Sequence, residues 1–434
     1  VSAHTCLQWR FRSTVALWLA KCKYVLKNCT LLLALKNEIF LKKYPLDLYE
    51  CQNCKLIQLS KVALANEMYG LSYGYWTSLS DLMINHMRKK IKRIKKFNLI
   101  KNNSFILDIG SSDATFLNLF KNYKKNLGLF AIDPSAEKFK KSFHDKKINL
   151  IVDYFSKEKI YNYLNSEEKV KKKFSLITSF AMFYDVNDPN SFCKDINKLL
   201  EKDGLWIVEF SYFPLLLKNL TYDQINHEHV TYYTLTIFQK IIDKHGLKVI
   251  DISFNEINGG SAEVIVSKKG SRYKVNKLKI SKVLEEEKLI NESSYRKFND
   301  RIDNVKKVVQ FFLKKNTKKI VGYGAATKGN IILNHCKINS RDIKYICDGN
   351  SQKLGQYTPG SNIKIISKEK MRKMKIDYLF VLIWSFRSEV IKQEKKFIRS
   401  GGKLIFPLPV FHIVDKENYR QYLKEDLKTF AFNL

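Results

Sequence analysis

The stretch from residue 104 to residue 120, SFILDIGSSDATFLNLF, constrains the fold more than any other part of the chain. Its apolar residues from 105 to 107 predict a buried parallel strand, and a turn follows from Asp108 to Asp113. Gly110 allows the backbone of this turn to approach a ligand closely. A helix is expected to begin at Thr115, with unpaired N–H groups at its N-terminus. This order predicts the opening of a nucleotide-binding α/β domain.

A second strand is expected from 127 to 132, and it leads into Asp133 and Pro134. An acidic residue about twenty positions past a glycine turn holds a ribose diol in sheets of this kind. The turn lacks the full G-x-G-x-x-G pattern of a dinucleotide site, and Ala114 stands where a third glycine is common. We therefore favour S-adenosylmethionine over NAD as the cofactor.

The later segments continue in the doubly wound order. A third strand is expected to end within 152–155, a fourth runs from 174 to 183, and a helix at 190–200 leads to a strand at 205–210. Ligands of such sheets bind beyond the carboxyl ends of the strands. The residues that we assign to the cofactor are Asp108, Gly110, Ser111, Ser112, Asp113, Asp133, Pro134, Phe155, Phe180 and Met182.

A dense group of proton-transfer side chains follows this domain, made of Asn226, His227, Glu228 and His229 and flanked by tyrosines such as Tyr222. Histidine titrates near neutral pH, and a neighbouring carboxylate can fix its tautomer and raise its basicity. The spacing differs from H-E-x-x-H, so a metal site is the weaker interpretation. An ordinary hydrogen-bonded role is the alternative for any single histidine. The density of the group and its place after a nucleotide-type domain favour a catalytic role.

A second strand, glycine turn and helix begin at residue 318 with KKIVGYGAATKGNIILNHC. Further strands are expected at 343–348, 377–384 and 403–409, which predicts a second α/β domain. Lys328 and the neighbouring N–H groups are suited to holding a phosphate, although the glycine spacing is not that of a Walker A loop. A plain structural βαβ unit is the alternative. The residues assigned to the substrate are Glu209, Tyr222, Tyr323, Thr327, Lys328 and Asn330.

A helical region from 61 to 99 is interrupted by the aromatic segment 69–78, YGLSYGYWTS. Its glycines permit a tight loop, and its rings and hydroxyl groups offer flat faces and hydrogen bonds. Simple aromatic packing is the alternative. The place of the segment immediately before the glycine turn predicts a lid over the cofactor, with Tyr75 among the catalytic candidates.

Two cysteines near the N-terminus, Cys51 and Cys54, form a CxxC pair between two short strand-like pieces. A structural zinc ion takes four ligands, so a second pair is needed. Cys22 and Cys29 are the nearest candidates, although Val25 occupies the place that a second CxxC requires. Two buried thiols without a metal are the alternative.

Composition limits the classes of function. The chain has 434 residues, 45% of them apolar, and a formal net charge of +35. Such a charge suits nucleic acid or an anionic membrane, but the excess is mostly lysine spread along the whole chain. We interpret it as solvated surface that also attracts a diphosphate, and we expect no specific nucleic-acid partner. A lysine-rich nucleic-acid-binding protein is the alternative that this charge supports.

The cysteine content and the apolar runs bear on location. Eight cysteines in a chain of this length do not suggest a disulfide scaffold, which fits a cytoplasmic protein in a reducing compartment. No run approaches the roughly 20 apolar residues that span a bilayer, so we expect no membrane insertion. We expect a monomer, with a dimer as the alternative.

Several segments match a known family in the same order. They are DIGSSDATFL, AMFYD, EFSYFPLLL, YDQINHEHVTYYTL, NGGS, GYGAATKGN, PGSNIKIIS and FPLP. Across residues 43–413 the chain resembles the sugar-nucleotide C-methyltransferases. Asn226 departs from this family, which usually has Tyr or Cys before the HEH sequence.

The resemblance implies an α/β fold with a small zinc domain, a class I S-adenosylmethionine methyltransferase domain and a C-terminal Rossmann-like domain. The boundaries that we expect are 1–60, 61–254 and 255–418, with a tail at 419–434. The implied substrate is a nucleotide-linked 4-keto-6-deoxy hexose that is methylated at C3. His229 is the implied base, with Glu228 and His227 beside it, and Lys328 and Asn330 lie on the nucleotide side. Methylation at oxygen or nitrogen of a small molecule is the alternative that uses the same cofactor half.

Overall fold

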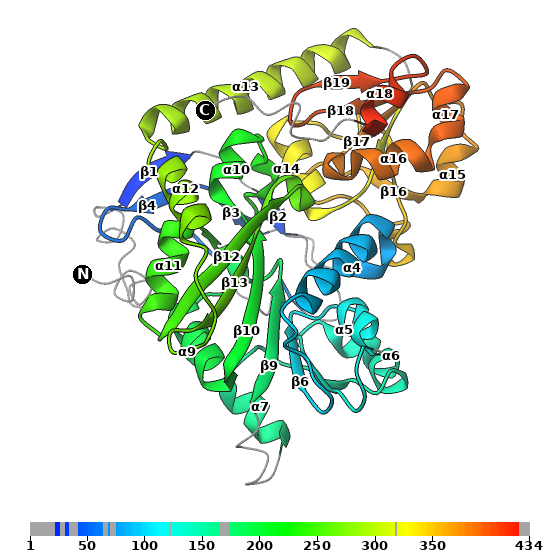
Figure 1. Ribbon diagram of the computed structural model, residues 1–434. Helices are drawn as coiled ribbons and strands as arrows, with labels where there is room; N and C mark the ends of the chain where they lie inside the picture. Colours follow the sequence, from blue (N-terminus) through cyan, green and yellow to red (C-terminus); the bar gives the residue numbers. More distant parts are fainter. Residues whose placement is uncertain are drawn as a thin grey trace.

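The computed structural model describes residues 22–26, 31–33, 42–63, 68–69, 75–121, 123–164, 173–316 and 319–424. Two mostly parallel sheets, each packed against helices, dominate this part of the chain, and a small antiparallel sheet lies beside them (Figure 1). The chain is therefore an α/β protein, as predicted.

The larger sheet has seven strands in the order β12-β13-β10-β9-β6-β7-β8. All neighbours from β10 to β8 are parallel, whereas β13 is antiparallel to both β10 and β12. The strands are β6 (Phe105–Ile109), β7 (Gly128–Ile132), β8 (Asn149–Ile151), β9 (Phe174–Phe180), β10 (Leu200–Ser211), β12 (Leu247–Asn255) and β13 (Ser261–Lys268). The carboxyl ends of β6, β7 and β9 meet at one edge, where a ligand is expected.

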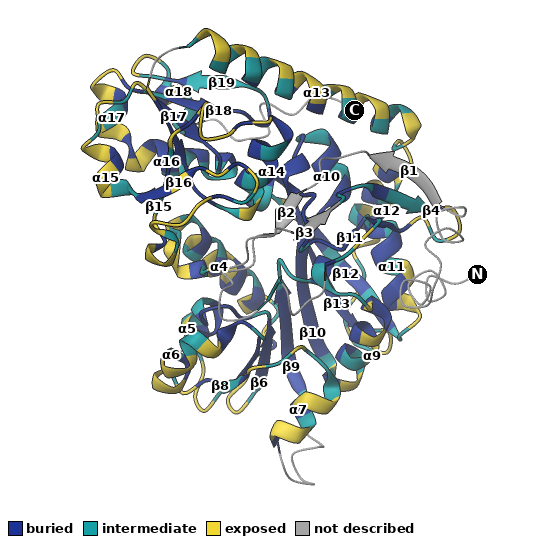
Figure 2. Cartoon of the chain, turned by 180° about the vertical axis from the view of Figure 1, so that it is seen from behind, coloured by how far each residue is buried: buried dark blue, intermediate teal, exposed yellow. Residues whose placement is uncertain are grey.

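Helices cover both faces of this sheet, and the strands between them are the most buried part (Figure 2). They are α4 (Asp81–Lys95), α5 (Thr115–Phe120), α6 (Lys140–Asp145), α7 (Lys157–Leu164), α9 (Pro189–Leu199) and α11 (Leu235–Asp243). Helix α10 (Phe213–Lys218) follows β10 but packs against the long helix at 292–315. Helix α4 begins at the cap residue Ser80, whose Oγ accepts the N–H of Met83. It buries Met83, Met87, Ile91 and Ile94, and each such side chain contributes roughly 1.5–3 kcal/mol.

Two strand predictions extend too far. The third strand, β8, ends at Ile151, so residues 152–155 form a loop beyond it. The fourth strand, β9, ends at Phe180 because Ala181 takes a left-handed conformation with φ of 54°. Both errors lie at the carboxyl edge, where the chain leaves the sheet and turns around the cavity.

The second sheet has six strands in the order β16-β15-β14-β17-β18-β19, and only β19 is antiparallel to its neighbour. Its strands are β14 (Ile320–Tyr323), β15 (Tyr345–Asp348), β16 (Lys364–Ser367), β17 (Tyr378–Val381), β18 (Lys403–Phe406) and β19 (His412–Val414). Its helices are α14 (Thr327–His335), α15 (Lys368–Arg372), α16 (Arg387–Gln393), α17 (Lys395–Arg399) and α18 (Tyr419–Lys424).

The helical stretch between the two sheets is divided into α12 (Lys277–Glu287) and α13 (Glu292–Lys315). Asn291 begins α13 with a capping box. Its side chain accepts backbone N–H groups of the first turn, and the hydroxyl of Ser294 accepts the backbone N–H of Asn291. Helix α13 then runs along the C-terminal sheet (Figure 1).

The small sheet joins the N-terminal region to the proton-transfer loop. Its order is β1 (Cys22–Leu26), β4 (Leu48–Cys51), β5 (Ile57–Leu59) and β11 (Thr231–Tyr232), and a separate pair is formed by β2 (Leu31–Leu33) and β3 (Lys42–Tyr44). Strand β11 follows His229 directly and pairs with β5. The N-terminal strands therefore hold one end of this loop in place.

Candidate active site

One cavity of about 930 Å³ lies between the carboxyl edge of the larger sheet and the C-terminal sheet. Residues from both α/β units line it, together with Tyr75 and the loop that carries the two histidines. The predicted site residues that line it are Tyr75, Asp108, Gly110, Ser111, Ser112, Asp133, Pro134, Phe155, Phe180, Met182, Glu209, Asn226, His227, Glu228, His229, Thr327, Lys328 and Asn330.

The glycine turn after β6 forms one end of the cavity. Gly110 has φ of +73°, and a Cβ atom there would lie 2.9 Å from Cγ of Met182, so the position suits glycine. Asp108 accepts the Thr178 hydroxyl at 2.6 Å. Burial outweighs this hydrogen bond and raises the pKa of Asp108 to about 7. This end of the cavity offers a narrow, polar cradle to a cofactor.

Asp133 lies at the end of β7, opposite the glycine turn. Its Oδ2 atom accepts the N–H of Ser112 at 2.8 Å, and its Oδ1 atom accepts the N–H and the hydroxyl of Ser135 at 2.7 and 2.6 Å. These bonds fix the carboxylate at the cavity wall. Oδ2 accepts only one of these bonds and has a further lone pair, so the group can still accept a ribose hydroxyl.

Asp113 is the one residue assigned to the cofactor that does not line the cavity. Its Oδ1 atom accepts the hydroxyl of Thr115 at 2.6 Å, and its Oδ2 atom accepts the N–H of Ser78 at 2.8 Å. Asp113 therefore ties the start of α5 to the aromatic segment. Residues 70–74 of the predicted lid lie outside the described residues.

Asn226 shapes the loop that carries His229. Its Oδ1 atom accepts the N–H groups of Glu228 at 2.9 Å and His229 at 3.3 Å, and its Nδ2 atom donates to the Gln224 carbonyl at 3.3 Å. This is the Asx-turn geometry that asparagine favours. We assigned Asn226 to catalysis, but these bonds give it the position of a residue that orients its neighbours.

His229 is buried at the cavity wall, with its ring centroid 4.0 Å from that of Tyr184. Burial, and then the positive charge of Lys328, lower the pKa of His229 well below its usual value, while the Gln224 carbonyl opposes this shift. Among the described residues, its Nδ1 atom has no hydrogen-bond partner. A neutral imidazole with an unpaired nitrogen can accept a proton.

Further carboxyl groups line the same cavity. Glu228 accepts the hydroxyl of Thr327 at 3.1 Å across the two α/β units, and His227 is buried beside it. Asp185 also lines the cavity, and burial, followed by the negative charge of Glu228, raises the pKa of Asp185 well above its usual value. Asp185 is not among the predicted site residues, although it ends the AMFYD segment that contributes to the family resemblance.

Next to this loop, the cavity wall brings together four residues from distant segments. The ammonium group of Lys328 donates to Oδ1 of Asn258 at 2.6 Å, and Asp223 accepts the indole N–H of Trp384 at 2.8 Å. Burial raises the pKa of Asp223 to about 6, although Lys328 and Trp384 oppose this shift. Burial also lowers the pKa of Lys328 to about 8, against the attraction of Asp223 and Glu228.

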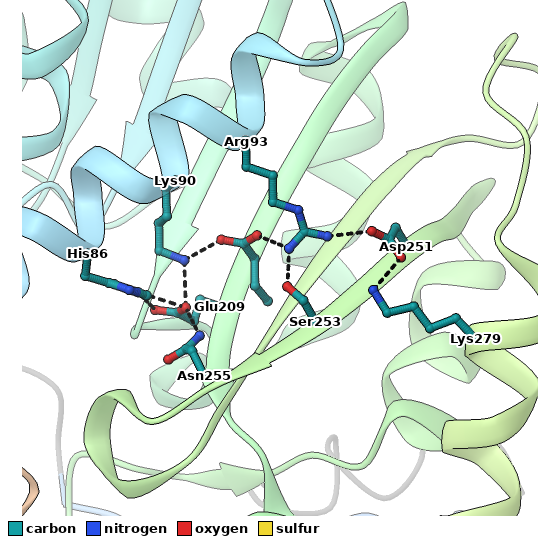
Figure 3. Close-up of polar contacts among 9 residues, drawn as sticks. His86, Lys90, Arg93, Glu209, Asp251, Ser253, Asn255 and Lys279 are labelled. Atoms are coloured by element: carbon teal, nitrogen blue, oxygen red, sulfur yellow. Dashed lines mark hydrogen bonds and ion pairs between the residues drawn. The ribbon is translucent and has the colours of Figure 1, made fainter. Parts of the chain in front are cut away.

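Glu209 belongs to a buried ion-pair network beneath the cavity (Figure 3). It accepts hydrogen bonds from His86 at 3.0 Å, Lys90 at 2.6 Å and Asn255 at 2.7 Å. Lys90 also contacts Glu263 at 2.5 Å, and the network continues through Arg93, Asp251 and Lys279. Helix α4 is thereby fastened to β10, β12 and β13. Glu209 was assigned to the substrate, but its carboxylate already has these partners.

Tyr222 and Tyr323 do not line the cavity, so the structure does not support their assignment to the substrate. Both are fully buried. The hydroxyl of Tyr222 lies 4.0 Å from Sγ of Cys336, and that of Tyr323 donates to Glu394 at 3.0 Å. Both tyrosines point into the core of the C-terminal unit because their apolar rings and their hydroxyl partners are there.

The predicted zinc ligands are only partly covered by the structure. Cys51 is buried, Cys54 lies in the turn between β4 and β5, and the backbone of Cys22 pairs with that of Cys51. Cys29 lies outside the described residues. Within the described ranges, no group of three or more His, Cys, Asp or Glu side chains is placed to hold a metal ion. Nor does any helix there combine the length and apolar character needed to cross a membrane.

Comparisons with known proteins agree with this geometry. Residues 83–252 match the family described as a methyltransferase domain, and residues 256–409 match the one described as the C-methyltransferase C-terminal domain. The chain is 28% identical to C-methyltransferase NovU from Streptomyces niveus over 382 residues, which cover 86% of this chain and 89% of that relative.

Solved structures are more distant. A S-adenosylmethionine-dependent methyltransferase from Clostridium acetobutylicum is 16% identical, with a TM-score of 0.32, and covers 42% of this chain and 91% of its own. The PH0226 protein from Pyrococcus horikoshii is 14% identical, with a TM-score of 0.35, and covers 45% of this chain and 95% of its own.

The sheet order, the glycine turn and the matched methyltransferase domain define an S-adenosylmethionine-dependent methyltransferase. The C-terminal unit narrows this class to the C-methyltransferases, because it matches the family described as the C-methyltransferase C-terminal domain. Together the two domains make the chain a C-methyltransferase that is related to NovU.

Proposed function

We propose that the protein methylates C3 of a nucleotide-linked 4-keto-6-deoxy hexose by enolisation followed by methyl transfer. The observation that carries the proposal is the neutral, buried imidazole of His229, which lines a cavity shared by two α/β units and whose Nδ1 atom lacks a partner among the described residues. A carbon acid next to a ketone needs such a base.

The cofactor end of the cavity is assigned to S-adenosylmethionine, which supplies an electrophilic methyl group when it is bound. In this proposal Asp133 accepts the ribose hydroxyls, and the backbone around Gly110 approaches the amino-acid end. The residues fit this group, because the cradle is closed to a side chain at Gly110 and lined by acidic oxygens. Thr327 and Asn330 also line the cavity, and we assign them to the substrate's nucleotide portion.

His229 takes the C3 proton, and the electron pair of that C–H bond forms the enolate. Asn226 holds the loop so that the imidazole faces the substrate. Since the reaction needs no metal, the predicted zinc ion would serve structure alone. The N-terminal cysteines remain a prediction on this point.

The test is a product analysis. The purified protein is incubated with S-adenosylmethionine and a nucleotide-linked 4-keto-6-deoxy hexose, and the product is examined by mass spectrometry and NMR. We expect a gain of one methyl group, attached to C3. A methyl group on oxygen or nitrogen would contradict the proposal. So would the absence of turnover by protein that binds S-adenosylhomocysteine.

A further inference from the structure

Lys328 lies at the N-terminal end of α14, yet its ammonium group turns toward the proton-transfer loop. It lines the same cavity as His229, and its charge reaches His229, Asp223 and Glu228. An ammonium group has three N–H donors. Among the described residues its one hydrogen bond goes to Asn258, which leaves two donors for a ligand.

The surroundings of Lys328 hold it in this position. Asn258 has a left-handed backbone with φ of 59°, and its carbonyl accepts Nε2 of Gln224 at 2.6 Å. The next residue, Gly259, packs so closely that a Cβ atom would lie 2.4 Å from the side chain of Thr221. The turn that receives Lys328 is therefore packed directly against the segment that leads to His229.

The carboxylate of Asp223 faces the same group. One of its oxygens accepts the indole N–H of Trp384, and the other has no hydrogen-bond partner among the described residues. An ionised Asp223 keeps Lys328 protonated without bonding to it directly. The titratable groups that act on Lys328 are thus Asp223 on one side and Glu228 with His229 on the other.

We propose that Lys328 is a catalytic residue whose ammonium group donates to the C4 oxygen of the substrate and stabilises the enolate. This inference rests on the proposed function. It assigns Lys328 to the reacting sugar rather than to a phosphate, which was its assignment from the sequence. A buried cation beside the base suits developing negative charge, because such charge is poorly stabilised by solvent there.

The electron flow balances without any further reagent. His229 accepts the C3 proton, the C–H pair forms the C3–C4 double bond, and the carbonyl pair moves to the oxygen beside Lys328. The enolate carbon then forms a bond to the methyl group as the S–C bond breaks, with its electrons left on sulfur. The carbonyl is restored, and the proton on His229 passes to solvent.

The variants Lys328→Met and Lys328→Arg test this assignment, with Lys344→Met as a control that removes one exposed lysine charge from the same unit. In D2O without methyl donor, we expect deuterium exchange at C3 to fall by about 10²–10³-fold in Lys328→Met, as for loss of one oxyanion donor. Lys328→Arg should retain part of the rate, and Lys344→Met all of it. Binding of S-adenosylhomocysteine confirms that each variant is folded.

The pH profile of kcat/KM gives a second readout that a merely structural role would not move. Lys328 lowers the pKa of His229, so its removal lets the imidazole keep its proton to higher pH. The acidic limb should therefore move to higher pH in Lys328→Met and stay near that of the wild type in Lys328→Arg.

If Lys328→Met does not fold, Asp223→Asn takes its place. Loss of this carboxylate lowers the pKa of Lys328 below about 8, so the alkaline limb should move to lower pH. The inference would be overturned if a variant raised KM but left kcat, the deuterium exchange at C3 and both limbs of the pH profile unchanged. Lys328 would then be assigned to the phosphates of the substrate. Absence of exchange and methylation in the wild-type protein would instead overturn the proposed function.

Discussion

Two walls of one cavity differ in how far their buried polar groups are hydrogen-bonded. On the wall formed by α4 and the sheet, Glu209 accepts hydrogen bonds from His86, Lys90 and Asn255. On the facing wall, His229 and Asp223 each keep a buried polar atom without a partner among the described residues. Buried polar atoms are normally paired, because an unpaired one costs about 1–3 kcal/mol. The paired wall holds the fold, whereas the other wall keeps unpaired polar atoms beside the cavity.

The largest effect is expected from breaking the paired wall at Lys90. Replacing it by methionine leaves Glu209 and Glu263 buried without their shared cation. Removal of one partner from a buried ion pair costs about 3–5 kcal/mol of the free energy of unfolding. Urea unfolding measures this loss, and Lys92→Met, which removes an exposed lysine from the same helix, is the matched control. Equal stability of the two variants would refute the structural role of this wall.

Glu209 should also make the free energy of unfolding depend on pH in the acid range. Burial alone would raise the pKa of Glu209, but Lys90 and His86 outweigh it and lower the pKa to about 2. A depressed pKa in the folded state contributes stability that is complete above about pH 4.5 and is lost as the pH falls toward 2. We expect the stability difference between wild type and Glu209→Gln to shrink by up to about 3 kcal/mol over this range. A difference that is constant with pH would contradict the shift.

Asn226 offers a smaller test on the open wall. Asn226→Ala removes the acceptor for the N–H groups of Glu228 and His229, and loss of a comparable cap costs about 1 kcal/mol. We expect kcat to fall while binding of S-adenosylhomocysteine is unchanged. Asn226→Asp keeps the acceptor and is the control. If it loses as much kcat as the alanine variant, the positioning role is wrong.

The smallest effect belongs to Thr327, whose hydroxyl contacts Glu228 in an exposed position. Because water replaces such a bond, Thr327→Val should change the free energy of unfolding by less than about 0.5 kcal/mol. Thermal unfolding measures this directly. A loss as large as that of Lys90→Met would show that the contact between the two units is structural.

The strands and the glycine turn were predictable because their signals are local. The apolar runs that became β6, β7 and β14 lie within a few residues of their turns, and Gly110 has the backbone conformation that its place required. Ala114 is left-handed as well, with φ of 63°, which explains why glycine is common at that position.

The partners of Glu209 were not predictable in the same way. Lys90 reaches it across 119 residues of sequence, from a helix whose lysines all look alike in the sequence. Asp223, Asn258 and Lys328 come together from two α/β units, and the periodicity of the sequence does not predict contacts between such distant segments. The cavity residues could be listed from motifs, whereas their pairing depended on how the units pack.

The most direct test of the central claim is deuterium exchange at C3 of the keto sugar by wild type and His229→Ala in D2O, without methyl donor. His229 acts as the base in this account, so wild type should exchange the proton and the variant should do so about 10²–10⁴-fold more slowly. Both should bind S-adenosylhomocysteine equally well. Exchange by His229→Ala at the wild-type rate would show that another group removes the proton.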